Sequence, residues 1–416
     1  MKEKKHKLLI IGAGIGQVPL VEKAHARGIH VTVVSPDGPY PCLKMADEVC
    51  NLDIYDRDAV VEYARTHGIT AVASDQNDLM MPTVAYVSEK LGLPGNHFDQ
   101  VWAYCNKNIY RKNCEKLGIP VPRHSATEHA TFPTEMAGQS FPWIVKPEDS
   151  QSSIGVTRVD AIDELEPAIE LALSKSHTHR AIVEEFFKGH EVVCEGFIYR
   201  GVYHLLAFAD RKYFNLEKLM IPSQTLFPSM VDKVLLDQIV DYETRMAKHI
   251  GLSFAIVHSE YLIDLVSHEI RVVESAPRGG GVYISSHLVP LATGIDVNEL
   301  LLDCVLGVET DMDARLSSCK RAAAGYICFC LPEGVVESVS GIDEIKKFSF
   351  VAMTCLDGLK VGVKTGPMLY KGARKGPVLV FAGDRTQMDE QIRTIQSVLD
   401  IQVRTADGRL AGIIWG

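Results

Sequence analysis

The sequence predicts a mixed fold, with an α/β beginning and an α+β remainder, and two observations support this prediction. In the first hundred residues, short apolar runs alternate with amphipathic stretches, which is typical of a parallel sheet with helical crossovers. Beyond residue 181, pairs of apolar runs are joined by short polar turns, which indicates antiparallel strands. A chain of 416 residues is expected to form about two to four domains, at roughly 100–200 residues each.

The first part should hold strands at 7–11, 29–34 and 70–73 and helices at 17–27 and 60–66. Gly12, Gly14 and Gly16 follow the first strand. A dinucleotide fingerprint needs its third glycine one place later, and an acid after the second strand. The sequence has Gln17 and Ser35 there, and it contains no G-x-x-x-x-G-K-[ST] phosphate loop. We therefore interpret the glycines as a structural turn and keep an NAD(P)-dependent oxidoreductase as an alternative.

A break at 117–122 follows, because two prolines and a glycine exclude a helix there. The elements expected after it are a strand at 141–147, a polar loop at 148–155, a helix at 161–175, strands at 181–187, 191–199 and 202–209, a strand pair at 254–264 and 269–275, and a smaller α+β part with strands at 325–330 and 378–381 and a helix at 388–399. We expect residues 210–212 in a loop. With Asp75 and Asp78, they are candidates for substrate contacts or simply solvated.

Charge and composition argue against several classes of partner. The formal net charge of −10 disfavours nucleic acid and membrane surfaces. No stretch approaches the ~20 apolar residues that cross a bilayer. The 10 cysteines are scattered without a C-x-x-C pair, so we expect reduced thiols in a cytoplasmic protein, with neither a zinc cluster nor a disulfide framework.

Two lysines are candidates for binding phosphate. Lys146 ends an apolar strand and precedes a Ser/Gly loop at 150–155 that includes Ser153. A cation beside hydroxyls and backbone N–H groups that can fold over oxygen atoms suits a phosphate. Lys107 precedes a helix and could reach the same nucleotide. For each lysine taken alone, a solvated side chain is the ordinary alternative.

A second group of residues suits a nucleoside. An apolar strand ends in Glu184 and Glu185, and Phe187 and Glu191 follow it. Such a strand offers backbone groups to an adenine edge and carboxylates to a ribose. A solvated loop explains these acids equally well.

Glu260 and Glu274 give the sharpest signal. They lie in two apolar runs joined by a short polar turn, and a hairpin centred on Ser267 would place them directly opposite each other. Like charges opposed across strands are destabilising, so a cation between them is expected. Mg²⁺, which prefers carboxylates together with substrate phosphates, fits this place. The alternation of apolar neighbours also allows another register, which would separate the pair.

Arg278 follows Glu274 by four residues and precedes Gly279–Gly281. An arginine there can stabilise the charge on a transferring phosphoryl group. The glycines predict a close backbone approach to a neighbour. A surface position is the alternative for the arginine.

In their order and spacing, these features resemble the ATP-grasp superfamily, over residues 1 to about 310. The resemblance implies a Rossmann-like pre-ATP-grasp domain with a parallel sheet at 1–105, a two-lobed ATP-grasp domain at 106–310 whose small lobe spans about 120–190, and a C-terminal α+β domain at 311–416. It also implies one ATP site with the following roles: Lys107, Lys146 and Ser153 bind phosphates, Glu184, Glu185 and Phe187 line the adenine pocket, Glu191 holds the ribose, Glu260 and Glu274 hold Mg²⁺ or Mn²⁺, and Arg278 and Lys146 act in catalysis.

Two positions depart from the common pattern. Ala276 stands where many members have a metal-binding asparagine; this looks more like the L-amino-acid ligase branch and makes a second metal ion less expected. His258 stands where D-alanine ligases have an arginine near the phosphate. A catalytic role and simple packing are equal alternatives for it.

The resemblance implies an ADP-forming carboxylate–amine ligase that makes an acyl phosphate. Its candidate substrates are an amino acid or similar small carboxylate and an amine, and a second copy of the chain is a candidate partner in a homodimer. One alternative is phosphorylation of bicarbonate, as in carbamoyl-phosphate synthase or biotin carboxylase. The alternatives from other classes are the oxidoreductase and a non-catalytic nucleotide-binding protein.

Overall fold

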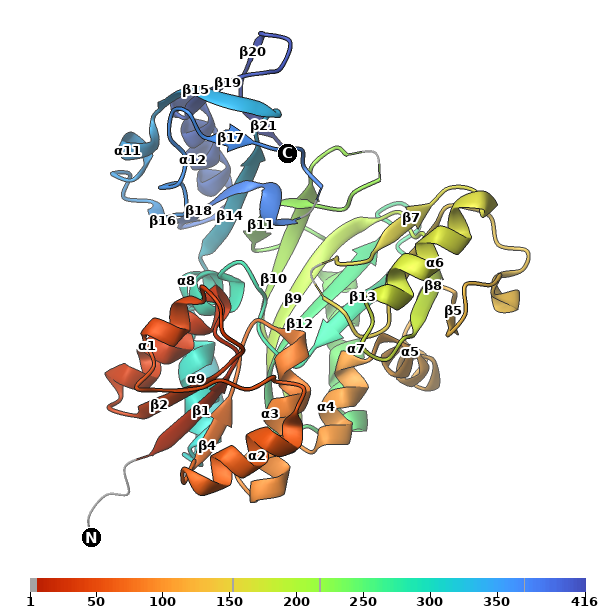
Figure 1. Cartoon of the computed structure of the whole chain (residues 1–416), viewed down its shortest axis with the longest axis vertical. Coiled ribbons are helices and arrows are strands. Elements are labelled where there is room, and N and C mark those ends of the chain that lie inside the picture. The colour runs from red at the N-terminus through yellow and green to blue at the C-terminus, as the bar shows by residue number, and fades with distance from the viewer. Residues whose placement is uncertain (1–5, 152, 217, 370) are drawn as a thin grey trace.

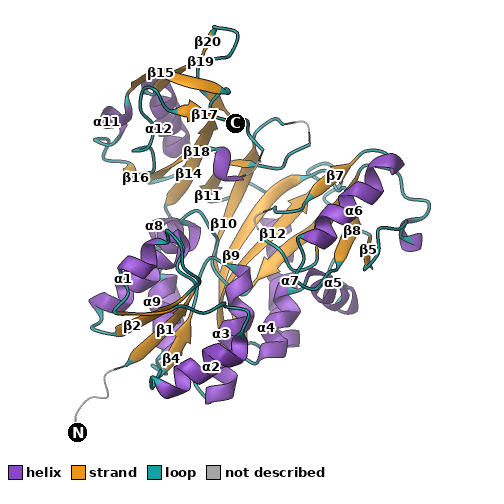
Figure 2. Cartoon of the chain, in the orientation of Figure 1, coloured by secondary structure: helices purple, strands orange, loops and turns teal. Residues whose placement is uncertain are grey.

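The computed structural model describes residues 6–151, 153–216, 218–369 and 371–416. Within these residues the strands form four sheets, and helices pack against them (Figure 1). Figure 2 shows helices gathered around the N-terminal sheet, whereas the centre of the molecule is built mainly of long strands.

The N-terminal sheet is parallel, with the strand order β3-β2-β1-β4. Its strands are β1 (Lys7–Ile11), β2 (His30–Val34), β3 (Glu48–Cys50) and β4 (Ala71–Ala73). The helices of this part of the chain are α1 (Val18–Ala26), α2 (Arg57–Thr66), α3 (Met81–Leu91) and α4 (Phe98–Cys105). Leu8 and Ile10 pack with α1 and the distant α9 (Val297–Val305), whereas Leu9 and Ile11 pack with α2 and α3. A parallel sheet covered on both faces requires such a continuous apolar strand, as the sequence predicts.

The small sheet is antiparallel and has the order β5-β8-β6-β7. Its elements, with the helix that leads into it, are α5 (Lys107–Lys116), β5 (His124–Thr127), β6 (Trp143–Pro147), β7 (Thr157–Val159), α6 (Leu165–Ser174) and β8 (Ala181–Glu185). The apolar side of α6, with Leu165, Ile169 and Ala172, packs on Trp143 and Val145. The small sheet and α6 project from the large sheet (Figure 1).

The large sheet runs in the order β13-β12-β9-β10-β11-β14-β18-β16, and β21 also pairs with β14. Its elements are β9 (His190–Tyr199), β10 (Val202–Tyr213), β11 (Pro222–Phe227), α7 (Lys233–Ile250), β12 (Phe254–Ile263), β13 (Ile270–Ala276), β14 (Ala323–Cys330), β16 (Val351–Thr354), β18 (Lys375–Ala382) and β21 (Ile414–Trp415). Arg200 and Gly201 join β9 to β10, both with positive φ, which is the geometry of a tight two-residue hairpin turn.

The remaining elements are α8 (Val289–Thr293), α10 (Met312–Ser317), β15 (Gly334–Ser340), α11 (Ile342–Ile345), β17 (Lys364–Thr365), α12 (Arg385–Val398), β19 (Asp400–Arg404) and β20 (Leu410–Ala411). Of these strands, β17, β15, β19 and β20 form the fourth sheet. None of the described helices is both long and apolar enough to span a membrane.

One local prediction is wrong. Residues 210–212 lie within β10 rather than in a loop, because Asp210 and Arg211 are buried and paired with β11. The strands expected at 325–330 and 378–381 are present as β14 and β18, and β14 pairs with β11 and so extends the large sheet. The proposed domain boundaries stay predictions.

Candidate active site

A cavity of about 270 Å³ lies between the small sheet and the large sheet. It is lined by residues that the sequence predicts for ATP, namely Lys107, Lys146, Ser153, Glu184, Glu185, Phe187, Glu191, Glu260 and Glu274. The two other predicted residues, His258 and Arg278, line an adjoining cavity of about 110 Å³. We call these the nucleotide cavity and the acceptor cavity.

The two cavities meet at four residues that line both of them: Gln151, Glu260, Glu274 and Lys371. We call these four residues the junction. The four residues come from three separate parts of the chain: Gln151 follows β6, the two glutamates lie on the paired strands β12 and β13, and Lys371 precedes β18.

A buried triad forms the wall of the nucleotide cavity. The Glu184 carboxylate accepts from Lys146 Nζ at 2.6 Å and from Arg111 Nε at 2.8 Å. Burial alone would raise the pKa of Glu184, but Arg111 and Lys146 outweigh burial and lower it to about 2. Burial also lowers the pKa of Lys146, and Glu184 opposes that shift. The Glu184 side chain thus holds Lys146 in place, and only its backbone is free to face a base. The sequence gives no signal for Arg111.

The loop after β6 is tied to the start of α5. Lys107 Nζ donates to the Ser150 carbonyl at 2.6 Å, and the backbone N–H of Lys107 donates to the Glu148 carbonyl at 3.0 Å. Asn106 caps α5 by accepting from the Ile109 N–H and donates to the Glu148 carboxylate. Ser153 is exposed and has a φ of 59°. A phosphate at this edge would meet Lys107, Lys146 and the backbone of this loop.

Arg211 connects two of the predicted carboxylates. Its guanidinium donates to Glu191 at 2.7 Å and to Glu260, and Tyr213 also donates to Glu191. Burial raises the pKa of Glu260, but Arg211 and His258 outweigh it and hold that pKa well below its usual range. Burial raises the pKa of Glu191, with Arg211 opposing it. Arg211 is thus a protein cation beside Glu260, and the metal ion expected between Glu260 and Glu274 stays a prediction.

Glu260 and Glu274 lie directly opposite each other on β12 and β13. The sequence predicts this opposition from a regular hairpin centred on Ser267, but the strands are not regular. A bulge at Val273 shifts the register, since Tyr261 pairs with Val272 and Ile263 with Ile270. A bulge re-aims side chains relative to a regular hairpin. Without the bulge, the register of the turn would not oppose the two glutamates.

The Glu274 carboxylate is suited to a cation. Among the described residues, none donates a hydrogen bond to it or pairs with it, whereas Glu260 already accepts from Arg211 and His258. The described part of the chain contains no cluster of three or more histidine, cysteine or acidic side chains arranged around a metal position. Two carboxylates plus phosphate oxygens are the usual ligands of Mg²⁺, and this pair fits that requirement.

His258 is buried between two carboxylates. Its Nδ1 faces Glu195, its register partner on β9, and its Nε2 lies 3.2 Å from Glu260. Burial alone would lower the pKa of His258, but Glu195 and Glu260 outweigh it and raise that pKa. The protonated ring can donate to both carboxylates. Sequence reasoning missed Glu195, whose apolar strand gives no sign of a buried acid.

Arg278 is buried rather than at the surface. Its Nε and Nη2 donate to the two oxygens of Asp78, at 2.8 and 2.9 Å, and its Nη1 donates to the Gly279 carbonyl. Burial opposes the charged form, but Asp78 outweighs it and raises the pKa of Arg278. The arginine therefore lines the acceptor cavity as a fixed, charged group.

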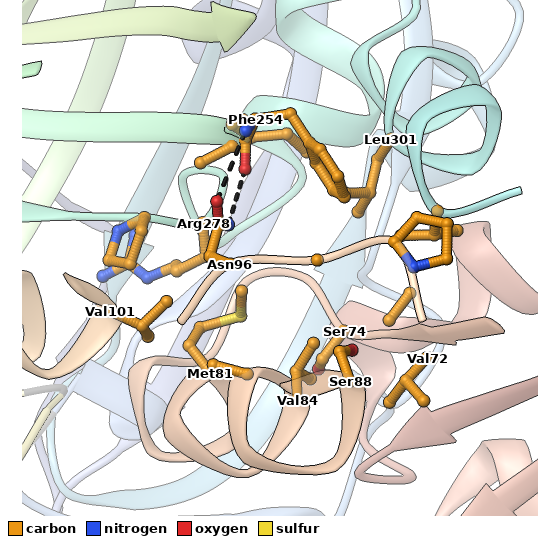
Figure 3. A pocket seen from close by; sticks show the side chains of 18 residues that line it. Val72, Ser74, Met81, Val84, Ser88, Asn96, Val101, Phe254, Arg278 and Leu301 are labelled. Atoms are coloured by element: carbon orange, nitrogen blue, oxygen red, sulfur yellow. Dashed lines mark hydrogen bonds between the residues drawn. The ribbon is translucent and has the colours of Figure 1, made fainter. Parts of the chain in front are cut away.

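A small cavity of about 30 Å³ lies on the other side of Arg278. Figure 3 shows its mostly apolar wall, including Met81, Val84 and Leu301, and the hydrogen bonds between Asn96 and the backbone of Phe254. A space of this size holds about one water molecule. It is a packing gap behind Arg278, and the nucleotide cavity and the acceptor cavity, which hold the predicted site residues, are the candidates for ligands.

Two of the three glycines after Arg278, Gly279 and Gly280, closely approach protein groups, whereas Gly281 has open space around it and lines the acceptor cavity. A Cβ on Gly279 would lie 2.8 Å from Asp75 Oδ1, and one on Gly280 would lie 2.6 Å from Glu195 Oε1. Asp75 is fully buried and accepts from the Gly279 N–H at 2.7 Å and from Ser285 and Asn298 at 2.8 Å. Asp75 is thus a support for the Arg278 loop, and its prediction as a substrate contact is wrong.

Protein side chains also occupy the space beside Gly12 and Gly14, two of the glycines after β1. The Gln17 side chain accepts from the Gly14 N–H at 3.0 Å, and a Cβ on Gly12 would meet the Met80 sulfur at 2.2 Å. This packing agrees with the interpretation of these glycines as a structural turn.

Comparisons with known proteins match this arrangement. The family model described as D-ala D-ala ligase C-terminus matches residues 114–200. The D-alanine–D-alanine ligase of Flavobacterium psychrophilum is 32% identical over 98 residues, which are 22% of this chain and 29% of that ligase. The chain is therefore aligned with less than a third of that relative's length.

Solved structures match nearly the whole chain. An L-amino acid ligase from Bacillus licheniformis superposes with a TM-score of 0.80 and 21% identity, over 97% of this chain and 100% of that one. This chain has the ATP-grasp fold. The ATP-grasp fold is shared by the biotin carboxylase domain of the Hydrogenobacter thermophilus 2-oxoglutarate carboxylase, solved with ADP, its magnesium salt and bicarbonate, which matches with a TM-score of 0.72 and 14% identity over 98% of this chain and 91% of that one.

Proposed function

We propose that this ATP-grasp chain is an ADP-forming carboxylate–amine ligase that uses ATP and Mg²⁺ or Mn²⁺. The observation that carries the proposal is that the nucleotide cavity and the acceptor cavity meet at Glu260 and Glu274. A metal-binding pair placed between a nucleotide and a second substrate is the arrangement that phosphoryl transfer requires. The L-amino acid ligase whose fold matches nearly the whole chain supports the same class.

The nucleotide would bind with its base against the backbone of Glu184–Phe187 and its ribose near Glu191. Its phosphates would meet Lys107 and Lys146, which their protein partners already hold in position. A metal ion held by Glu260 and Glu274 would supply charge neutralisation at the phosphates. Fixed charges in place before the substrate arrives are worth more than charges that must reorganise.

The carboxylate substrate would lie in the acceptor cavity, where Arg278 and His258 supply positive charge. One of its oxygens attacks the γ-phosphorus, and the bond to the bridging oxygen breaks with its electron pair leaving on ADP. The acyl phosphate that results is attacked at carbon by an amine, and phosphate leaves. The protein forms no covalent bond in either step and acts by positioning and electrostatics.

The loop at 150–155 would cover the phosphates, because an acyl phosphate exposed to water hydrolyses. Gln151 at the junction and the Ser150 carbonyl that accepts from Lys107 both belong to this loop. Closure of this loop would therefore change the lining of both cavities, because Gln151 lines each of them.

A phosphate-release screen with ATP, Mg²⁺ and pairs of amino acids tests the proposal. We expect release with at least one pair, with a loss of at least a hundredfold in Glu274→Gln. Glu269→Gln is the matched control, because Glu269 is exposed on the same hairpin and pairs with Arg271. Release that needs bicarbonate and no amino acid would move the chain to the bicarbonate-phosphorylating class. The absence of ATP binding would refute the proposal.

A further inference from the structure

Lys371 is the one junction residue that comes from the C-terminal part of the chain. It lies in a single helical turn, Lys371–Ala373, between β17 and β18. Among the described residues that line the nucleotide cavity, it is also the one from beyond residue 310. No motif of the ATP site includes it, so its position requires a separate explanation.

The segment that carries Lys371 is anchored to the large sheet. Arg374 donates to the Pro222 carbonyl on β11, and its guanidinium lies 5.6 Å from the centre of the Tyr326 ring on β14. Strand β18 then pairs with β14 along most of its length. These contacts fix the backbone from which the Lys371 side chain reaches the junction.

Among the described residues, Lys188 is an exposed cation at the nucleotide cavity without a printed partner, whereas the other cations that are buried or half-buried around the two cavities, apart from Lys371, already have partners. Lys146 pairs with Glu184, Arg211 with Glu191 and Glu260, and Arg278 with Asp78. Lys107 donates to the Ser150 carbonyl. Among the described residues, Lys371 forms no ion pair and donates no hydrogen bond, although it is half-buried beside the two glutamates. Its three N–H donors have no partner within the described part of the chain and can therefore serve a ligand.

We propose that Lys371 is a catalytic residue that donates to the γ-phosphoryl group while that group passes between the two cavities. The inference rests on the proposed function and deepens it, because it gives the C-terminal part of the chain a direct role in the reaction. In the transfer, a carboxylate oxygen bonds to the γ-phosphorus and the bond to the bridging oxygen of ADP breaks. Lys371 forms and breaks no covalent bond and moves no proton; it offers hydrogen-bond donors and charge to the equatorial oxygens.

The location distinguishes this role from general attraction of the nucleotide. Lys107 and Lys146 lie on the α5 and β6 side of the nucleotide cavity, and the acceptor cavity does not include them. Lys371 lines both cavities, as do Glu260 and Glu274. A group at that place contacts a triphosphate at its γ end. A diphosphate, which lacks that end, should not depend on it.

The test is the affinity of the full chain for two probes, Mg²⁺ with the β,γ-imido analogue of ATP and Mg²⁺ with ADP, measured by isothermal titration calorimetry. For Lys371→Met we expect at least a tenfold loss of affinity for the triphosphate analogue and a change within about twofold for ADP. Lys371→Arg should restore the affinity for the analogue to within about threefold. Lys364→Met is the matched control, because Lys364 is exposed on the neighbouring strand β17, and it should change neither affinity.

An equal loss for both probes in Lys371→Met would show a structural role and overturn the proposal, as would no loss for either. Thermal unfolding of each variant separates these outcomes from misfolding, and Lys371→Arg retains a cation at the position if the methionine variant does not fold. If the wild-type chain binds neither probe, the proposed function itself fails. If it binds both and Lys371→Met binds them equally well, only the role of Lys371 fails.

Discussion

The wall of the nucleotide cavity and the junction differ in how far the protein satisfies its own charges. In the wall, Glu184 is paired with two cations and is 3% exposed. At the junction, Glu274 and Lys371 form no ion pair among the described residues. The wall is complete before a ligand arrives, whereas the junction leaves charge for a ligand to balance. Groups that only hold a nucleotide can be fixed by folding, but groups that follow a moving charge must remain available.

Removing Glu184 should have the largest effect on stability. Glu184→Ala leaves Lys146 and Arg111 buried without their carboxylate, and breaking a buried pair in this way costs about 3–5 kcal/mol. Urea denaturation monitored by circular dichroism would measure the loss. Glu185→Ala, one residue along and partly exposed, is the control and should change stability by less than about 1 kcal/mol. A loss of unfolding free energy below about 1 kcal/mol in Glu184→Ala would show that Glu184 does not pair with Lys146 and Arg111 in the ligand-free protein.

The same carboxylate should make stability depend on pH. The pKa of Glu184 is about 2 in the folded protein against an ordinary value of 4.5. Because the folded-state pKa is lowered, its contribution is present above pH 4.5 and is lost as the pH falls toward 2. At 1.36 kcal/mol per unit, the contribution is about 3 kcal/mol. Unfolding free energies from pH 5.5 to 2.5 should fall more steeply for the wild type than for Glu184→Gln, and parallel curves would contradict the assignment.

Removing the support of the Arg278 loop should lower stability by a smaller amount. Asp75→Ala removes the acceptor of three buried donors, from Gly279, Ser285 and Asn298. Leaving buried donors unsatisfied costs about 1–3 kcal/mol. Denaturation should detect this loss, and ATP turnover should fall with it because Arg278 is no longer held. Asp53→Ala, at an exposed loop position of the same sheet, should leave both quantities unchanged.

Removing the Glu274 charge should change stability in the opposite direction. Glu274→Gln removes a charge that faces Glu260 across the strands, so stability should rise by about 0.2–1 kcal/mol. Glu260→Gln should instead lower stability, because Arg211 and His258 lose their charged partner. Both variants should lose ATP turnover. A drop in stability for Glu274→Gln would mean that its carboxylate has a partner in the folded protein.

The fold could be predicted from the sequence where local pattern decides. The continuous apolar run at Leu8–Ile11 gives the parallel sheet, and the Arg200-Gly201 turn gives the β9–β10 hairpin. The predicted site residues line two adjoining cavities, because the order and spacing of the motifs along the chain indicate which strands and loops carry them.

The rest depends on contacts between residues far apart in the chain. Arg111 lies in a polar helix, and only its burial against Glu184 distinguishes it from a surface arginine. The bulge at Val273 is not predictable, because apolar alternation allows either register. The predicted loop at Arg211 is wrong because a charged residue in a strand is indistinguishable from a solvated one until its partners are placed. Lys371 lies nearly a hundred residues after the last motif.

The pairing of β11 with β14 has a consequence for any truncation of this chain. Strand β11 is buried along its whole length and has β10 on one side and β14 on the other. A fragment that stops before β14 would present an apolar strand with a row of unpaired backbone groups, which is a template for aggregation. The piece that carries the ATP motifs is therefore not a free-standing module, and exchange of the C-terminal part between relatives would have to carry a matching β14.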